Sequence, residues 1–336
     1  MKSIISILLF LYIIPSNKAQ SFTEINGEFI GVVDSKISIG DYNNDGYLDF
    51  VIAGKKDDVY TSYDVKLYKN NGNNSFTELS LASNINHVNQ IRFFDFDNDG
   101  FLDMIAHIND PFSRVVIYFN KNGSFFEFEL SLYTLGQSFD LGDIDNDSDI
   151  DIVVSGFYDP GEFTRIYTNT GNFTYVERSM FIQDKNFHDL DFKDIKLLDY
   201  DLDGDQEIVL SDEYSYDKFR IYFNDGGYFK TFIEIYPNLS FSDLAWADFD
   251  TDGDYDFVVC GMKFTYQTSI YQNQGNNSFI EILAEITDVY GGSVVWGDYD
   301  NDGDTDILLT GFTGSIPIAE IIQNIDNASF PKANIV

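Results

Sequence analysis

The sequence is poor in cysteine and in basic residues, and each shortage excludes a class of protein. Its 336 residues include one cysteine, Cys260, so no intramolecular disulfide can form. Cys260 lies in the apolar stretch "DFVVCG" and is expected to be a small buried side chain. Twenty Lys and Arg against 56 Asp and Glu give a formal charge of −36, which excludes the basic surface that nucleic acid requires. Hydrophobic residues make up 44% of the chain, so it is expected to fold despite this charge.

Long hydrophobic runs are also lacking, apart from one at the N-terminus. Lys2 precedes an apolar stretch from Ile4 to Ile14, and the small residue Ala19 follows. This layout predicts a secretory signal peptide at residues 1–19, a mature domain at residues 20–336 and an extracellular location. The stretch is too short to span a bilayer comfortably, so no membrane insertion is expected after cleavage. An N-terminal membrane anchor is the alternative.

Helix-period segments are absent as well, and the chain instead repeats one motif six times. The motif resembles "GDYDNDGDTDILLTG" at residues 297–311. Its first aspartates are about fifty residues apart: Asp41, Asp95, Asp143, Asp199, Asp248 and Asp298. A strand of alternating polarity precedes each motif, and an apolar strand, an "IYxN" strand and an aromatic-rich strand follow it. Four-strand repeats of this length predict an all-β, six-bladed β-propeller, with seven blades as the less favoured alternative.

The strand count also predicts how the ring closes. "SFTEI" at residues 21–25 matches a fourth, outer strand, yet no blade precedes it. We expect it to complete the sixth blade by pairing with residues 319–324. The C-terminal copy of this strand carries Pro331, which lacks the amide that a β-ladder needs.

The acidic turn has the pattern D-x-[DN]-x-D-[GS]-x-x-[DE], which predicts a metal site. Positions 1, 3, 5 and 9 offer side-chain oxygens and position 7 offers a backbone carbonyl, as at the front of an EF-hand loop. Oxygen ligands without Cys or His favour Ca²⁺, or less well Mg²⁺ or Mn²⁺, so up to six Ca²⁺ are expected. The predicted ligands in the first three turns are Asp41, Asn43, Asp45, Tyr47 and Asp49; Asp95, Asp97, Asp99, Phe101 and Asp103; Asp143, Asp145, Asp147, Asp149 and Asp151. Those in the last three are Asp199, Asp201, Asp203, Asp205 and Glu207; Asp248, Asp250, Asp252, Asp254 and Asp256; Asp298, Asp300, Asp302, Asp304 and Asp306.

The six turns are not equivalent. Those starting at Asp95, Asp248 and Asp298 match the pattern at every position, and we expect them to bind Ca²⁺ most tightly. The first turn has Asn43 in place of an aspartate, so it is expected to bind least tightly. The third turn has Ser148 where the others have glycine, a position that favours a positive φ.

Six such turns, each followed by an apolar strand and in four copies also by a glycine, resemble the FG-GAP and VCBS-type repeats of integrin α-subunit propellers and of many secreted bacterial proteins. The resemblance covers roughly residues 21–330. It implies a β-propeller with Ca²⁺ bound at the turns of one face and ligands that often meet the opposite face. Integrin propellers have seven blades, so the ligand sites of that family are not transferred here blade by blade.

These observations predict a non-catalytic binding or adhesion module for a protein or a carbohydrate. None of the three histidines lies in a nucleophile or zinc pattern. Trp246 and Trp296 share the register of core residues and are expected in the core. The loops opposite the acidic turns are rich in aromatic residues that suit such ligands: Tyr60, Tyr63, Phe112, Tyr158, Phe163, Tyr214, Tyr216 and Tyr266. A lectin or a carbohydrate-active enzyme is the alternative, because some polysaccharide lyases use calcium-rich propellers.

Overall fold

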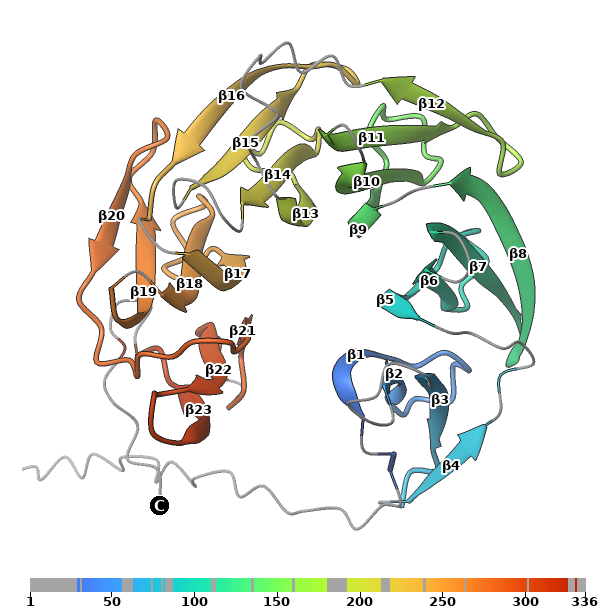
Figure 1. The fold of residues 1–336 in the computed structure, drawn as a ribbon, viewed down its shortest axis with the longest axis horizontal. Coiled ribbons are helices and arrows are strands. Elements are labelled where there is room, and N and C mark those ends of the chain that lie inside the picture. The colour runs from blue at the N-terminus through green and yellow to red at the C-terminus, as the bar shows by residue number, and fades with distance from the viewer. Residues whose placement is uncertain are drawn as a thin grey trace, which may run out of the picture.

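The fold is an all-β ring of six blades (Figure 1). The computed structural model describes residues 29–30, 32–55, 63–73, 75–79, 81, 87–109, 113–133, 136–158, 161–179, 192–212, 218–237, 240–262, 264–300, 302–325 and 330. These residues contain strands β1 to β23 and no helix. None of their elements is therefore an apolar helix long enough to cross a bilayer. The predicted six-bladed propeller is confirmed.

Each blade is an antiparallel sheet whose strands follow in chain order from the inside of the ring to the outside. The strands of blades 1 to 3 are β1 (Val33–Gly40), β2 (Asp49–Lys55), β3 (Tyr63–Asn70) and β4 (Phe76–Leu79); β5 (Val88–Phe94), β6 (Asp103–Asn109), β7 (Ser113–Lys121) and β8 (Ser124–Tyr133); β9 (Gly136–Gly142), β10 (Asp151–Tyr158), β11 (Gly161–Asn169) and β12 (Tyr175–Ser179). Those of blades 4 to 6 are β13 (Phe192–Leu198), β14 (Glu207–Asp212), β15 (Phe219–Asn224) and β16 (Phe229–Ile235); β17 (Ser240–Ala247), β18 (Asp256–Met262), β19 (Tyr266–Asn273) and β20 (Phe279–Ile282); β21 (Val294–Gly297), β22 (Asp306–Phe312) and β23 (Pro317–Ile322).

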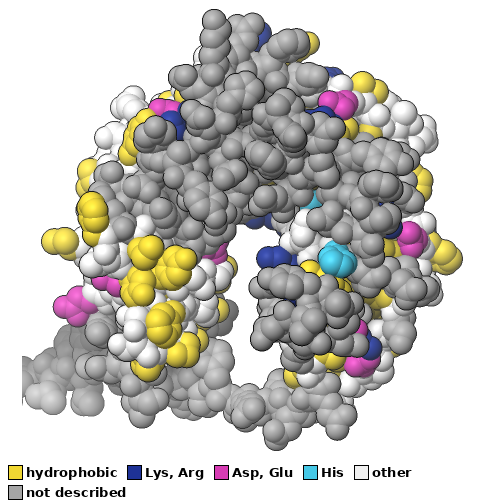
Figure 2. Space-filling view, viewed as in Figure 1, with side chains coloured by type: hydrophobic (Ala, Val, Ile, Leu, Met, Phe, Trp, Pro, Cys, Tyr) yellow, Lys and Arg dark blue, Asp and Glu magenta, His cyan; other side chains and the backbone are white. Residues whose placement is uncertain are grey.

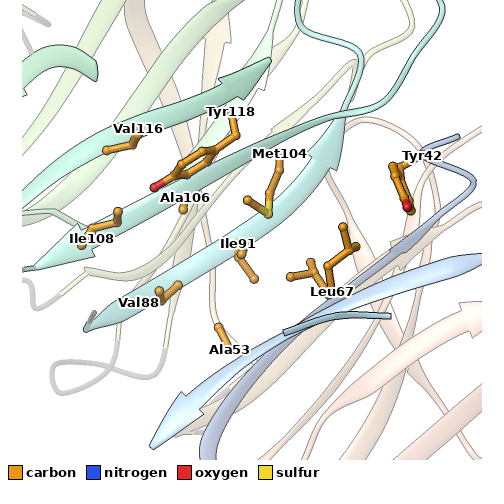
Figure 3. Packing of buried hydrophobic residues seen from close by; sticks show 11 residues of the cluster. Tyr42, Ala53, Leu67, Val88, Ile91, Met104, Ala106, Ile108, Val116 and Tyr118 are labelled. Atoms are coloured by element: carbon orange, nitrogen blue, oxygen red, sulfur yellow. The ribbon is translucent and has the colours of Figure 1, made fainter. Parts of the chain in front are cut away.

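Neighbouring blades pack through the same positions at the five interfaces from blades 1 and 2 to blades 5 and 6. Between blades 1 and 2, Leu67 lies toward Ile91 and Met104 in a buried cluster (Figure 3), to which Val51 also belongs. The residue two positions after the last acidic residue of a turn points toward the next blade, as Val51 does. The inner strand of that next blade contributes a residue such as Ile91. Alternation along a strand places these side chains on opposite faces of each sheet, so every blade has an apolar surface on both sides.

The two tryptophans and the cysteine lie in these interfaces, as predicted. Trp296 stacks on Phe249 with ring centroids 5.8 Å apart in the core between blades 5 and 6. Trp246 packs edge-on against Phe219 at 5.3 Å. Cys260 is buried in the same core as Phe249. The tryptophans therefore contribute to the packing between blades.

The seam between blades 6 and 1 differs from the other five interfaces. Ile37 and Ile39 of β1, which correspond in register to buried or partly buried residues of the other inner strands, are 56% and 64% exposed. Val295 and Leu308 on the facing side of blade 6 are 48% and 44% exposed. Five blades have four strands, and the described part of the sixth has three.

Two predictions lie outside the described residues. These are the signal peptide at residues 1–19 and the closing strand at residues 21–25, with its C-terminal alternative around Pro331. Phe330, which is described, is buried against Phe249 and Trp296, and its carbonyl accepts a hydrogen bond from the amide of Glu285 at 3.3 Å. The C-terminal segment thus contributes at least this side chain to the core of blades 5 and 6.

Candidate metal centres

The six acidic turns lie on one face of the ring, because each joins the innermost strand of a blade to the second strand. Two residues of each of the first five turns carry a positive φ, as at Asn98 and Gly100, with φ of 54° and 88°, and in the described part of the sixth turn Gly303 does so. A Cβ added to Gly100 would meet nothing within 4 Å, so the preference for glycine comes from the backbone alone. Ser148 adopts the same conformation with a φ of 72°, which confirms the expectation for the third turn.

The first aspartate of a turn organises the backbone around it. In the second turn, the Oδ1 atom of Asp95 accepts the amide of Asp99 at 3.1 Å, and its Oδ2 atom accepts the amide of Gly100 at 2.9 Å. The carboxylate of Asp99 in turn accepts the amide of Phe101 at 3.0 Å. The turns starting at Asp41, Asp143, Asp248 and Asp298 repeat the two bonds to the first aspartate. These bonds bring alternate carboxylates to one side of the turn.

In five of the turns, three carboxylates offer oxygen atoms that all lie within 4.8 Å of one another. Four of these groups combine positions 1, 3 and 5, and the third turn combines positions 1, 3 and 9. The groups are Asp95, Asp97 and Asp99; Asp143, Asp145 and Asp151; Asp199, Asp201 and Asp203; Asp248, Asp250 and Asp252; Asp298, Asp300 and Asp302. In the first turn, the amide nitrogen of Asn43 donates to Asp49 at 2.7 Å, so this side chain presents a donor to the carboxylate.

These groups contain buried oxygen atoms that have no hydrogen-bond partner. They are Oδ1 of Asp97, Asp145 and Asp300 at position 3, and Oδ1 of Asp199 at position 1. A buried carboxylate oxygen without a partner is costly, and a cation among the carboxylates would remove that cost. The donors are all hard oxygens, so their chemistry suits a cation such as Ca²⁺.

The last acidic residue of each turn lies deeper than the others. Asp103 is 1% exposed, and its two oxygens accept the amides of Phe96 at 2.9 Å and Asn120 at 2.7 Å. The same pair of backbone bonds holds Asp151, Glu207, Asp256 and Asp306. Each oxygen accepts one bond and retains a lone pair for a metal. Position 9 therefore ties the turn to the third strand of its blade.

Burial changes the acidity of these deep carboxyls. It raises the pKa of Asp103 and of Asp151 to about 6, while the backbone amides act in the opposite direction. It raises the pKa of Glu207 and of Asp256 to about 7 for the same reason. Neighbouring aspartates of the same turn raise these values further.

The asparagine of the "IYxN" strand has a role that sequence reasoning missed. The side-chain amide of Asn120 donates to the carbonyl of Tyr42 in the preceding blade at 2.6 Å and to that of Leu102 in its own blade at 3.0 Å. Asn224 and Asn324 make the corresponding bonds to Ile144 and Phe249. The recurrence of this asparagine in the repeats was the available signal in the sequence. By itself it predicted only a hairpin turn and not a contact between blades.

The fold and the turns define a class: a β-propeller with a carboxylate-rich turn between the first two strands of each blade. The FG-GAP-like repeat family matches residues 41–106, 95–154 and 248–309. These matches cover more than half of the chain, and they include the turns of blades 1, 2, 3, 5 and 6. The chain belongs to the FG-GAP-like repeat family. No curated protein matched the sequence.

Proposed function

We propose that the protein is a secreted, calcium-stabilised propeller that binds a protein or carbohydrate ligand on the face opposite the acidic turns. The calcium part rests on the buried carboxylate oxygens that lack a partner. The binding part rests on an aromatic surface over blades 5 and 6. No catalytic step is proposed.

This surface, the blade 5–6 patch, consists of side chains at the ends of β18, β19 and β22 and in the segments beside them. Its members are Met262, Phe264, Tyr266, Tyr290, Phe312 and Ile316. Phe264 is 94% exposed and Ile316 is 60% exposed. Hydrophobic side chains gather over the part of this face formed by blades 5 and 6 (Figure 2). Contiguous exposed apolar surface of this kind is typical of interaction sites.

The patch is held rigidly. Tyr266 and Tyr290 stack with centroids 5.8 Å apart and rings inclined by 16°. Tyr290 is anchored by two backbone bonds of 3.0 Å to Phe312. A Cβ on Gly314 would come within 2.6 Å of the Tyr266 ring, so only glycine lets the ring lie there. Pre-positioned aromatic side chains lose little entropy on binding, which favours a recognition role.

Of the aromatic residues predicted for this face, Tyr266 lies in the patch. Tyr63 lies in blade 1, where its ring contacts that of His87 with centroids 4.2 Å apart and planes inclined by 32°. Tyr158 and Phe163 lie at the corresponding end of blade 3. Tyr60, Phe112, Tyr214 and Tyr216 lie outside the described residues.

The experiment is a binding screen with the calcium-loaded protein on a glycan array and against extracellular protein preparations, followed by variants. Phe264→Ser and Tyr290→Ser should weaken the binding of any ligand found by at least tenfold. Tyr228→Ser is the matched control, because Tyr228 is also exposed, at 60%, but lies in the β15–β16 turn on the acidic face. Equal loss in all three variants, or none in the first two, would contradict a ligand site on this patch.

A further inference from the structure

In four of the acidic turns, a side chain in or next to an outer strand of the blade holds the carboxylate at position 3. It donates to the Oδ2 atom of that aspartate. In the second turn the donor is Lys121, whose Nζ lies 2.9 Å from Asp97 and 3.1 Å from Oδ2 of Asp99. In the third turn Arg178 donates to Asp145 at 2.8 Å. We call this side chain the outer clamp.

Blades 5 and 6 place an uncharged amide in the same position. Gln323 donates to Oδ2 of Asp300 at 2.7 Å, and Gln272 donates to Oδ2 of Asp250. The donor thus contacts the same carboxylate oxygen in all four turns. Its charge is +1 in blades 2 and 3 and zero in blades 5 and 6. In the second, third and sixth turns the other oxygen, Oδ1, is the buried atom without a partner, so the clamp leaves the inner oxygen available.

We propose that the outer clamp sets the calcium affinity of each turn: Gln272 and Gln323 make the turns of blades 5 and 6 tight sites, and Lys121 and Arg178 make those of blades 2 and 3 weak ones. The inference rests on the proposed calcium binding. All four clamps hold the aspartate in place, so they preorganise it to a similar degree. They differ in charge, and a cation bonded to Oδ2 repels a divalent ion at Oδ1 of the same carboxylate.

Lys121 has a second effect, because it also occupies Oδ2 of Asp99, a predicted ligand at position 5. Its ammonium group already neutralises part of the charge of the turn, so Ca²⁺ relieves less repulsion there. Both effects lower the affinity of a turn whose ligand pattern is complete. The ligand pattern alone places the Asp95 turn among the tightest calcium sites, whereas the outer clamp places it among the weaker ones.

The first turn also has a cationic neighbour, although the cation contacts position 5 instead of position 3. Lys69 lies 3.0 Å from Asp45 at position 5, and the turn already lacks one ligand charge because of Asn43. Cationic neighbours are thus found at blades 1 to 3, and amides at blades 5 and 6. As the calcium concentration rises, blades 5 and 6 would fill first and blades 1 to 3 later.

The test is calcium titration of the full chain by calorimetry, with variants that exchange the clamps. Wild-type protein should show at least two classes of site. Lys121→Gln should move one site from the weak class to the tight class, with a gain of about tenfold at low salt. Gln272→Lys should do the reverse. Lys121→Arg is the control that retains the charge, and its affinity should stay near that of wild type.

Three outcomes of this titration support or overturn the outer-clamp proposal. Opposite shifts in Lys121→Gln and Gln272→Lys that shrink in high salt would support the proposal. Calcium binding by the wild type with no shift in either exchange variant would overturn the clamp proposal and leave calcium binding intact. No binding by the wild type would overturn both. Circular dichroism in saturating calcium verifies that each variant is folded, and Lys121 is exposed enough, at 55%, for substitution to spare the core.

Discussion

The side-chain amide of Asn120 in blade 2 donates a 2.6 Å hydrogen bond to the carbonyl of Tyr42 in the acidic turn of blade 1. The backbone amide of the same residue donates to Asp103, the deepest carboxylate of its own turn, at 2.7 Å. One residue therefore joins two neighbouring turns. Asn224 and Asn324 repeat the contact, so a hydrogen-bond network links the turns of blades 3 and 4 and those of blades 5 and 6 in the same way.

This network makes Asn120 a sensitive position. Asn120→Ala would leave the buried carbonyls of Tyr42 and Leu102 without their donor, at a cost of about 3 kcal/mol of unfolding free energy. Asn70→Ala is the control, since the side chain of Asn70 donates to Leu48 within its own blade at an exposed site. Urea unfolding of both variants measures the difference. Similar losses would show that the contact between blades adds nothing.

Ser148 predicts a stabilising substitution. A left-handed backbone costs an L-residue roughly 1 kcal/mol relative to glycine, so Ser148→Gly should raise the unfolding free energy by about that amount. Gly100→Ser, the reciprocal change in the second turn, should lower it by a similar amount. Denaturant midpoints of the two variants in saturating calcium check the signs. A lower unfolding free energy for Ser148→Gly would contradict this. It would mean that contacts of the serine side chain stabilise the fold by more than its left-handed backbone costs.

The deep carboxyls predict a pH dependence whose sign depends on metal. In the metal-free protein, Glu207 and Asp256 have folded pKa values of about 7, above their ordinary values, so the stability they contribute is present at low pH and is lost as the pH rises through about 7. In excess Ca²⁺ the carboxylates bind in their charged form, and acid releases the metal. Between pH 5 and 7, the melting temperature should therefore fall with pH in chelator and rise with pH in calcium. Slopes of the same sign would contradict this assignment.

The exposed residues at the seam predict that blade 6 packs on blade 1. Leu308 has the register of Val258, which is buried between blades 5 and 6, yet it is 44% exposed. If the ring closes in solution, Leu308→Asp should cost more than about 2 kcal/mol, because it places a charge in an apolar interface. Leu283→Asp is the matched control, because Leu283 is fully exposed. Equal melting temperatures of the two variants would indicate that the seam stays open.

Local patterns were sufficient to predict the blades and their turns, because strand alternation, turn glycines and carboxylate spacing are encoded within about fifteen residues. The positions of Asp95, Asp97 and Asp99 around one point followed from their spacing alone. The deep placement of Asp103 did not, since its partner amide at Asn120 belongs to another strand. The outer clamps could not be predicted from the sequence either. Arg178 and its partner Asp145 are 33 residues apart, and no local pattern specifies which side chain contacts the aspartate.

The central claim is that the six acidic turns hold calcium and that the ring depends on it. A site that binds only the folded state adds about 2.7 kcal/mol at a hundredfold excess of ligand over Kd, and several such sites rival the net stability of a domain. The direct measurement is a pair of thermal melts of the full chain, one in excess Ca²⁺ and one in excess chelator, at the same ionic strength. We predict a much lower melting temperature in chelator, because no disulfide holds the ring and each turn then crowds three or four carboxylates without a divalent cation among them. Coincident melts would show that the turns hold nothing on which folding depends, and would contradict the account.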